Sequence, residues 1–214
     1  MSRIIDQIKE HIPYDVFSDT EICNLFPGSS DSRFALIKRA IAANEIIHLR
    51  RGLYHLSKNY CRSSINKFVI AQKIYGPSYI SFESALAYYG LIPEDVVTIT
   101  SACLKRSNQF ETPFGIFSYN SVPSSIFYVC VDRVQVENQV FFVATPWKAI
   151  VDYVYVNNLE WVGLKPLIES IRIEEGALFD LNKDDLDKLE FFYKSKRVKK
   201  FIESLKRDLM LGRS

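Results

Sequence analysis

Hydrophobic residues recur at helical spacing in the first part of the chain, and turn residues interrupt them. Isoleucines return every three or four positions, which predicts a helix over residues 3–12 with one buried stripe. Pro13 ends this helix, because proline lacks the amide hydrogen that the next helical turn would use. Val16 and Phe17 then predict a short extended segment.

A second helix is predicted directly after this segment. Ser18 and Glu21 have the spacing of a capping box, in which each side chain bonds the other residue's amide. The helix continues through Leu25 and Phe26 and ends at the turn Pro27-Gly28. A third helix is predicted over residues 31–44.

The third helix carries Phe34, Ile37 and Ile41 on one stripe, which we expect to pack inward. Two short extended runs follow within residues 45–56, on either side of Arg51-Gly52. Glycine tolerates the positive φ of a tight hairpin turn, so this segment predicts a two-stranded wing. The order of these elements is that of a winged helix-turn-helix, whose third helix fits the major groove of double-stranded DNA.

The charge distribution agrees with this interpretation. Residues 1–30 hold two basic and five acidic side chains, whereas residues 31–58 hold six basic and two acidic ones. A small domain with one basic half can approach phosphates in one orientation. The predicted DNA contacts are Ser32, Arg33, Lys38 and Arg39 on the third helix, and Arg50 and Arg51 on the wing. A protein–protein role for such a module remains an alternative.

The periodicity restarts after a short polar joint at residues 60–63, which predicts two domains, 1–60 and 61–214. Helices are expected over residues 64–76 and 82–89, and another from Thr145-Pro146 onward, with Thr145 as its N-cap. Period-two runs predict strands at residues 96–100, 115–119, 126–129 and 140–143. The predicted class is α+β: a winged helix-turn-helix, then a mixed α/β domain with a mainly antiparallel sheet and C-terminal helices.

The C-terminal part is helical and divided by charge. Residues 174–190 hold seven acidic and two basic side chains, and residues 194–213 hold eight basic and two acidic ones. The two segments form either an intramolecular helix pair or a docking surface for a nucleic acid or a partner protein. The residues expected at such a surface are Lys196, Arg197, Lys199 and Lys200.

Composition bounds the possible functions. The chain has 214 residues, 48% of them hydrophobic, and no apolar run reaches the length of a membrane span. The four cysteines are far apart, so we expect reduced thiols and a cytoplasmic protein that does not engage a membrane. The three histidines lack metal-ligand spacing, and no phosphate-binding loop or nuclease motif is present. We therefore predict a non-enzymatic protein with no catalytic residue, metal or cofactor.

One run of residues resembles a known family. The segment Tyr79-Ile-Ser-Phe-Glu-Ser-Ala-Leu-Ala-Tyr-Tyr-Gly-Leu-Ile-Pro-Glu94 is similar to the opening of the second domain in AbiEi-type antitoxins. Further similar pieces follow in the same order at residues 99–101, 114–119 and 144–152, and the wing carries the family's Arg-Gly-Leu-Tyr. The resemblance covers about residues 1–160. It departs at Trp147, where the family commonly has Glu.

The resemblance implies the antitoxin of a bacterial type IV toxin–antitoxin pair, a system of abortive infection and phage defence. Its N-terminal domain would repress its own promoter, and its second domain would counteract a nucleotidyltransferase-like toxin. The alternative is a stand-alone winged-helix transcriptional regulator whose second domain senses a ligand or mediates assembly.

Overall fold

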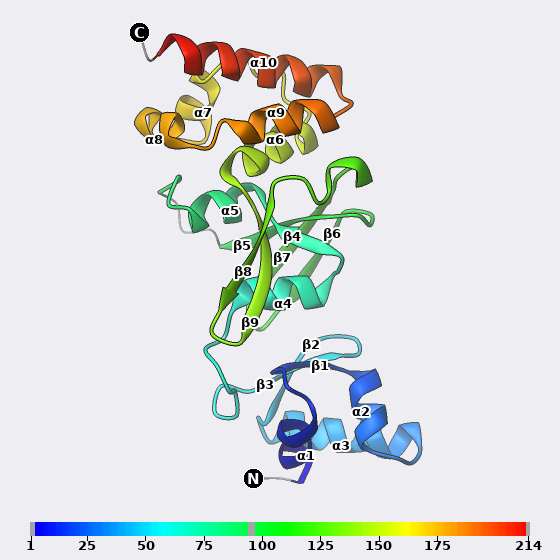
Figure 1. Ribbon diagram of the computed structural model, residues 1–214. Helices are drawn as coiled ribbons and strands as arrows, with labels where there is room; N and C mark the ends of the chain where they lie inside the picture. The colour runs from blue at the N-terminus through cyan, green and yellow to red at the C-terminus, as the bar shows by residue number, and fades with distance from the viewer. Residues whose placement is uncertain (1–2, 94–96, 213–214) are drawn as a thin grey trace.

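The computed structural model of the chain describes residues 3–93 and 97–212. The N-terminal unit contains three helices and three strands: α1 (Arg3–His11), β1 (Val16–Ser18), α2 (Asp19–Leu25), α3 (Ser30–Ala42), β2 (Ile46–Arg50) and β3 (Leu53–Leu56). The strands form one antiparallel sheet in the order β1-β3-β2. This unit lies at one end of an elongated molecule, and the C-terminus lies at the other end (Figure 1).

The N-terminal unit has a hydrophobic core that follows from its sequence pattern. Ile4, Ile5 and Ile8 of α1 are buried and pack with Ile37 and Ala40 of α3. The predicted capping box is present at the start of α2, where the Ser18 amide donates to Glu21 Oε2 over 2.7 Å and the Ser18 hydroxyl accepts from the Glu21 amide. Such a box satisfies two amides at the helix start that have no partner inside the helix.

The rest of the chain is built around a six-stranded sheet with the order β6-β7-β5-β4-β9-β8. Its elements, as far as the sheet and its nearest helices, are α4 (Lys67–Ile74), β4 (Ser78–Ile80), α5 (Phe82–Tyr88), β5 (Thr98–Cys103), β6 (Asn108–Thr112), β7 (Gly115–Ser121), the 3-10 helix η1 (Ser124–Ile126), β8 (Val131–Val136), β9 (Gln139–Ala144) and α6 (Pro146–Val156). Three neighbouring pairs are antiparallel, and the pairs β4–β9 and β5–β7 are parallel. The sheet is therefore mixed.

Four further helices form a layer at the end far from the N-terminal unit (Figure 1). They are α7 (Lys165–Ser170), α8 (Glu175–Asp180), α9 (Asp184–Phe192) and α10 (Lys196–Leu211). Helices α9 and α10 pack against each other and against α6. Within the described residues, no helix combines the length and the apolar character that a membrane crossing requires.

A buried polar cluster joins this helical layer to the sheet. Lys148 and Asp152 of α6 form an ion pair of 2.6 Å, with both side chains fully buried. Asp152 also accepts hydrogen bonds from the hydroxyls of Tyr79 in β4, Ser81 after β4, and Tyr193 after α9. The carboxylate is thus the common acceptor for groups from three separate parts of the chain.

The structure agrees with the predicted mixture of helices and strands and corrects several details. Residues 126–129 form the end of the 3-10 helix η1 and the turn after it instead of a strand, and three strands (β4, β6 and β8) were not predicted. Thr145 occupies the N-cap of α6 without making a side-chain capping bond. Val96, the first residue of a predicted strand, lies outside the described residues.

Phe34 is the clearest exception to the predicted burial. Ile37 and Ala40 on the same helix are buried and Ile41 is partly buried, but Phe34 is 68% exposed. The inward stripe of α3 therefore excludes Phe34, and the prediction for this residue was wrong. A large aromatic side chain stands in solvent on the first half of α3.

Candidate nucleic-acid interface

Helix α3 presents a cationic and partly aromatic side to solvent. Its N-cap is Ser29, whose hydroxyl accepts from the Ser32 amide over 3.2 Å. Phe34 and Lys38 are four residues apart, so they lie one above the other on the helix. Lys38 and Arg39 are both exposed. In the described part of the chain the Lys38 side chain has no hydrogen bond or ion pair, so its ammonium is available for a ligand.

The β2–β3 hairpin is fixed beside the start of α2. Gly52 has a φ of +72°, and its carbonyl accepts a hydrogen bond from the Asp19 amide over 3.0 Å. A Cβ added to Gly52 would lie 2.9 Å from a carboxylate oxygen of Asp19, so both the backbone angle and the close approach favour glycine here. Arg51, in the turn, is exposed and makes no side-chain bond within residues 3–93 and 97–212.

A groove of about 500 Å³ runs between α2, α3 and the hairpin. Its lining includes Ser30 and Phe34 from α3, and His48 and Arg51 from the hairpin. Hence the structure brings the predicted wing residue Arg51 to the same surface as α3. The sequence pattern had assigned Phe34 to the core, whereas His48 was expected to be a surface residue or a phosphate contact.

Two predicted contacts on α3 have partners inside the protein. The Arg33 guanidinium donates to the carbonyls of Gly28, over 2.5 Å, and Phe26, so it satisfies carbonyls at the end of α2. The Ser32 hydroxyl donates to the Ser29 carbonyl over 2.8 Å. Both side chains hold the α2–α3 turn together, and a DNA contact by either would have to share the group with that turn.

Arg50 lies away from the groove, on the side of the second domain. Its Nε donates to the Ile74 carbonyl over 2.7 Å, and its guanidinium carbon lies 6.0 Å from the centre of the Phe110 ring. Neighbouring Leu49 and Leu53 are buried in the hydrophobic cluster of the second domain. Arg50 was expected to contact DNA from the wing, but these contacts place its side chain against the second domain.

The cationic residues of α10 divide into bonded and exposed ones. Arg197 donates to the carbonyls of Val154, Tyr155 and Leu159, so it caps the end of α6. Lys206 forms ion pairs with Asp187 and Glu190 of α9. The acidic and basic segments therefore make an intramolecular helix pair, the first of the two predicted alternatives. Lys196 and Lys200 are exposed and Lys199 is half-buried.

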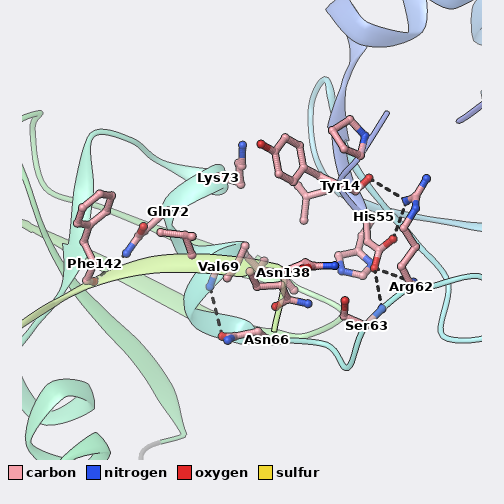
Figure 2. A pocket seen from close by; sticks show the side chains of 16 residues that line it. Tyr14, His55, Arg62, Ser63, Asn66, Val69, Gln72, Lys73, Asn138 and Phe142 are labelled. Atoms are coloured by element: carbon pink, nitrogen blue, oxygen red, sulfur yellow. Dashed lines mark hydrogen bonds and ion pairs between the residues drawn. The ribbon is translucent and has the colours of Figure 1, made fainter. Parts of the chain in front are cut away.

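A second cavity, of about 460 Å³, lies where the two units meet. Figure 2 shows Tyr14 and Arg62 on one side of it, with Gln72, Lys73 and Phe142 on the other. Arg62 is held by an ion pair of 3.0 Å with Asp15 and by the carbonyls of Lys9 and Ile12, so its charge stabilises the end of α1. The Lys73 ammonium lies 4.9 Å from the centre of the Tyr14 ring.

His55 lines this cavity, and Cys61 beside it packs against the N-terminal core. The His55 Nδ1 donates to the Leu56 carbonyl over 2.5 Å, and burial lowers the pKa of His55. Cys61 Sγ is 3.9 Å from the same nitrogen but donates to the carbonyls of Leu56 and Ser57. Burial raises the pKa of Cys61 to about 11, which keeps it a thiol at neutral pH. A nucleophilic cysteine needs the opposite shift, so this pair is structural.

No protein-family model and no curated protein sequence matches this chain. Among the described residues, no group of three or more histidine, cysteine or acidic side chains is arranged to hold a metal ion. The resemblance to AbiEi-type antitoxins therefore depends on the ordered motifs of the sequence alone.

Proposed function

We propose that the N-terminal unit is a winged helix-turn-helix that binds double-stranded promoter DNA, with α3 in the major groove. The observation that carries this proposal is the shared surface of α3 and the hairpin turn. Arg51 lines the groove between them, and Lys38 lies one turn along α3 from the groove residue Phe34. Both cations are exposed and have no partner within the described residues. The order α1-β1-α2-α3-β2-β3 is the one such modules use. Unpaired cations on one face are what phosphate neutralisation requires.

The contacts fall into two groups. Lys38 and Arg39 on α3 would contact the groove edges and nearby phosphates, and Arg51 would contact the backbone from the hairpin turn. Arg33 and Ser32 would act mainly by fixing the angle between α2 and α3, since both are bonded within that turn. Arg50 is left out of the proposed surface because it bonds the second domain.

The first experiment titrates the full chain against the DNA upstream of its own gene, by fluorescence anisotropy at several salt concentrations. We expect the combined Lys38→Gln, Arg39→Gln and Arg51→Gln variant to bind at least tenfold more weakly. Each lost phosphate contact should flatten the logarithmic salt slope by about one unit. The matched control changes three exposed cations of the second domain, Arg133, Lys165 and Lys188, to Gln. Equal loss in both variants, or loss in neither, would contradict the assigned surface.

For the second domain, we extend the proposal to antitoxin activity against a nucleotidyltransferase-like toxin, on the strength of the sequence resemblance. The test is growth of cells that express the toxin gene adjacent to this one, with and without the full chain. Protection should persist in the Lys38, Arg39 and Arg51 variant, because repression and protection would use different domains. Absence of such a neighbouring gene, or toxicity that the chain leaves unchanged, would contradict this part.

A ligand-sensing regulator is the second candidate function, and one observation favours it. The cavity between the units is lined from both sides, so a molecule bound there would contact the N-terminal unit and the second domain together. A small molecule that raises the melting temperature and changes DNA affinity, in the absence of any toxin, would favour this function over the antitoxin.

A further inference from the structure

We infer that Phe34 reads thymine in the major groove, through contact between its ring and the 5-methyl group. This inference rests on the proposed function and adds to it the source of base preference. Exposed apolar side chains on a helix in the major groove have one apolar feature to contact there, the methyl of thymine. Phenylalanine cannot read the hydrogen-bonding edges of the bases, so its preference would be confined to that methyl.

The first step of the argument is the exposure of Phe34. At 68% exposed, it leaves most of an apolar ring in water, although Ile37 and Ala40 of the same helix are nearly completely buried. Burial of apolar surface stabilises a complex by about 25 cal/mol per Å². Covering the exposed Phe34 ring with an apolar group of a partner would therefore contribute favourably to the free energy of binding.

The second step is the surroundings of the ring. The groove between α3 and the hairpin has one carboxylate in its lining, that of Asp19, which lies against Gly52 of the hairpin turn. Phe34 lines the same groove together with Arg33, His48 and Arg51, and Lys38 lies one helical turn further along α3. These basic neighbours favour a polyanion over the apolar face of a protein. Among polyanions, double-stranded DNA combines phosphates at this spacing with an apolar group on the groove floor.

The third step is the place of Phe34 along the helix. It is the fifth residue of α3, which begins at Ser30. The N-terminal residues of a recognition helix are those nearest the base edges, whereas residues toward its C-terminal end lie closer to the backbone. Phe34 is therefore placed for a base contact, and Lys38 and Arg39 for phosphates.

The experiment first selects bound duplexes from a random library with the full chain and then replaces each thymine of the selected site by uracil. Uracil has the same hydrogen-bonding edge and lacks only the methyl. We expect at least one replacement to weaken wild-type binding by about fourfold, the effect of burying one methyl-sized group. In Phe34→Ala the same replacement should change the affinity by less than a factor of 1.5.

Two controls separate the outcomes. Phe191→Ala removes a ring of 78% exposure from the opposite end of the molecule and should keep the wild-type sensitivity to uracil. Phe34→Leu keeps an apolar side chain and should retain part of it. Because Phe34 is exposed, Phe34→Ala should leave the melting temperature within about 2 °C of wild type.

The inference is overturned if Phe34→Ala keeps the full uracil sensitivity, or if no thymine of the selected site is sensitive. It is also overturned if the change abolishes self-association, seen by analytical ultracentrifugation, since Phe34 would then be a protein contact. If the library yields no selected site, or if the Lys38, Arg39 and Arg51 variant binds normally, the proposed function fails. A selected site whose affinity depends on these cations but not on Phe34 removes this inference alone.

Discussion

Asp152 shows how one side chain can organise a large part of the second domain. It accepts hydrogen bonds from Tyr79, Ser81 and Tyr193, and it pairs with Lys148 inside a fully buried cluster. The Lys148 ammonium also lies within 5.5 Å of the ring centres of both tyrosines. Taking an ion pair out of water is costly, and only a complete set of partners offsets that cost. Replacing one member of the ion pair should therefore lower the free energy of unfolding, and the size of the loss tests this explanation.

Asp152→Asn should lower the free energy of unfolding by about 3–5 kcal/mol, because it leaves the Lys148 ammonium buried without its counter-charge. Lys148→Met should cost less, since the carboxylate keeps its three hydroxyl donors. Urea unfolding at neutral pH measures both. Equal losses in the two variants would contradict this explanation.

The same cluster predicts a pH dependence of known sign. Burial lowers the pKa of Lys148, and Asp152 opposes that shift. In Asp152→Asn the opposition is gone, so at a pH between the lowered value and 10.5 the unfolded chain binds a proton that the folded chain does not. Stability then rises with pH. The deficit of the variant, measured in the same urea experiment, should thus be smaller at pH 10 than at pH 7.

At the C-terminal ends of two helices, α1 and α6, the backbone carbonyls accept hydrogen bonds from an arginine that lies elsewhere in the chain. Arg62 donates to the carbonyls of Lys9 in α1 and of Ile12 directly after it, and Arg197 donates to carbonyls at the end of α6. The last carbonyls of a helix lack partners within it and carry partial negative charge, so a guanidinium satisfies several of them together. Each arginine therefore ties a distant part of the chain to the end of a helix.

Arg197→Gln should destabilise the chain by about 2 kcal/mol, the usual effect of losing hydrogen bonds to a charged group. The neighbouring exposed Lys196→Gln should change stability by less than about 0.5 kcal/mol. Urea unfolding of the two variants checks the difference. Similar values would mean that Arg197, like Lys196, is a solvated charge.

The helices were the most predictable elements. Local signals fix them: the isoleucine spacing of α1, the Ser18–Glu21 box of α2 and Pro146 at the start of α6. Strands β6 and β8 lie at the edges of the sheet and have few buried residues, so their sequences lack a clear alternation. Phe34 was misassigned because periodicity gives the helix face but not the position where the core ends.

The candidate site could be predicted only in part, because charge is visible in a sequence and bonding partners are not. Lys38, Arg39 and Arg51 are exposed as expected. Arg39 donates to the Ala35 carbonyl of its own helix, four positions away, and remains exposed. Arg33, Arg50 and Arg197 donate instead to carbonyls outside their own helix or strand, which are 5–7, 24 and 38–43 positions away. No local pattern distinguishes the two groups.

At the scale of the whole molecule, the N-terminal unit and the second domain have separate cores that touch along one seam. Val16, Leu49 and Leu53 belong to the hydrophobic cluster of the second domain, although the chain places them in the first unit. Conversely, Cys61, which a division at residue 60 assigns to the second domain, packs against the N-terminal core. A division of the chain at residue 60 would therefore cut through contacts that belong to the N-terminal unit.

Arg62 makes this boundary testable. Its guanidinium bonds Asp15 and the carbonyls of Lys9 and Ile12, and its own amide donates to Asp15 over 3.0 Å. A fragment of residues 1–60 lacks all of these bonds, whereas a fragment of residues 1–66 keeps them. We expect the longer fragment to be more stable by about 2–3 kcal/mol, a large margin for a domain of this size.

Circular dichroism during heating measures the two fragments directly, and Arg62→Ala in the longer one assigns the difference. That variant should lose most of the added stability, because the helix end and the Asp15 carboxylate then lose their shared partner. Lys58→Ala, which removes an exposed cation four residues earlier, should behave like the unchanged fragment. If residues 1–60 melt at the same temperature as residues 1–66, Arg62 contributes nothing to the N-terminal unit and the boundary lies at residue 60 after all.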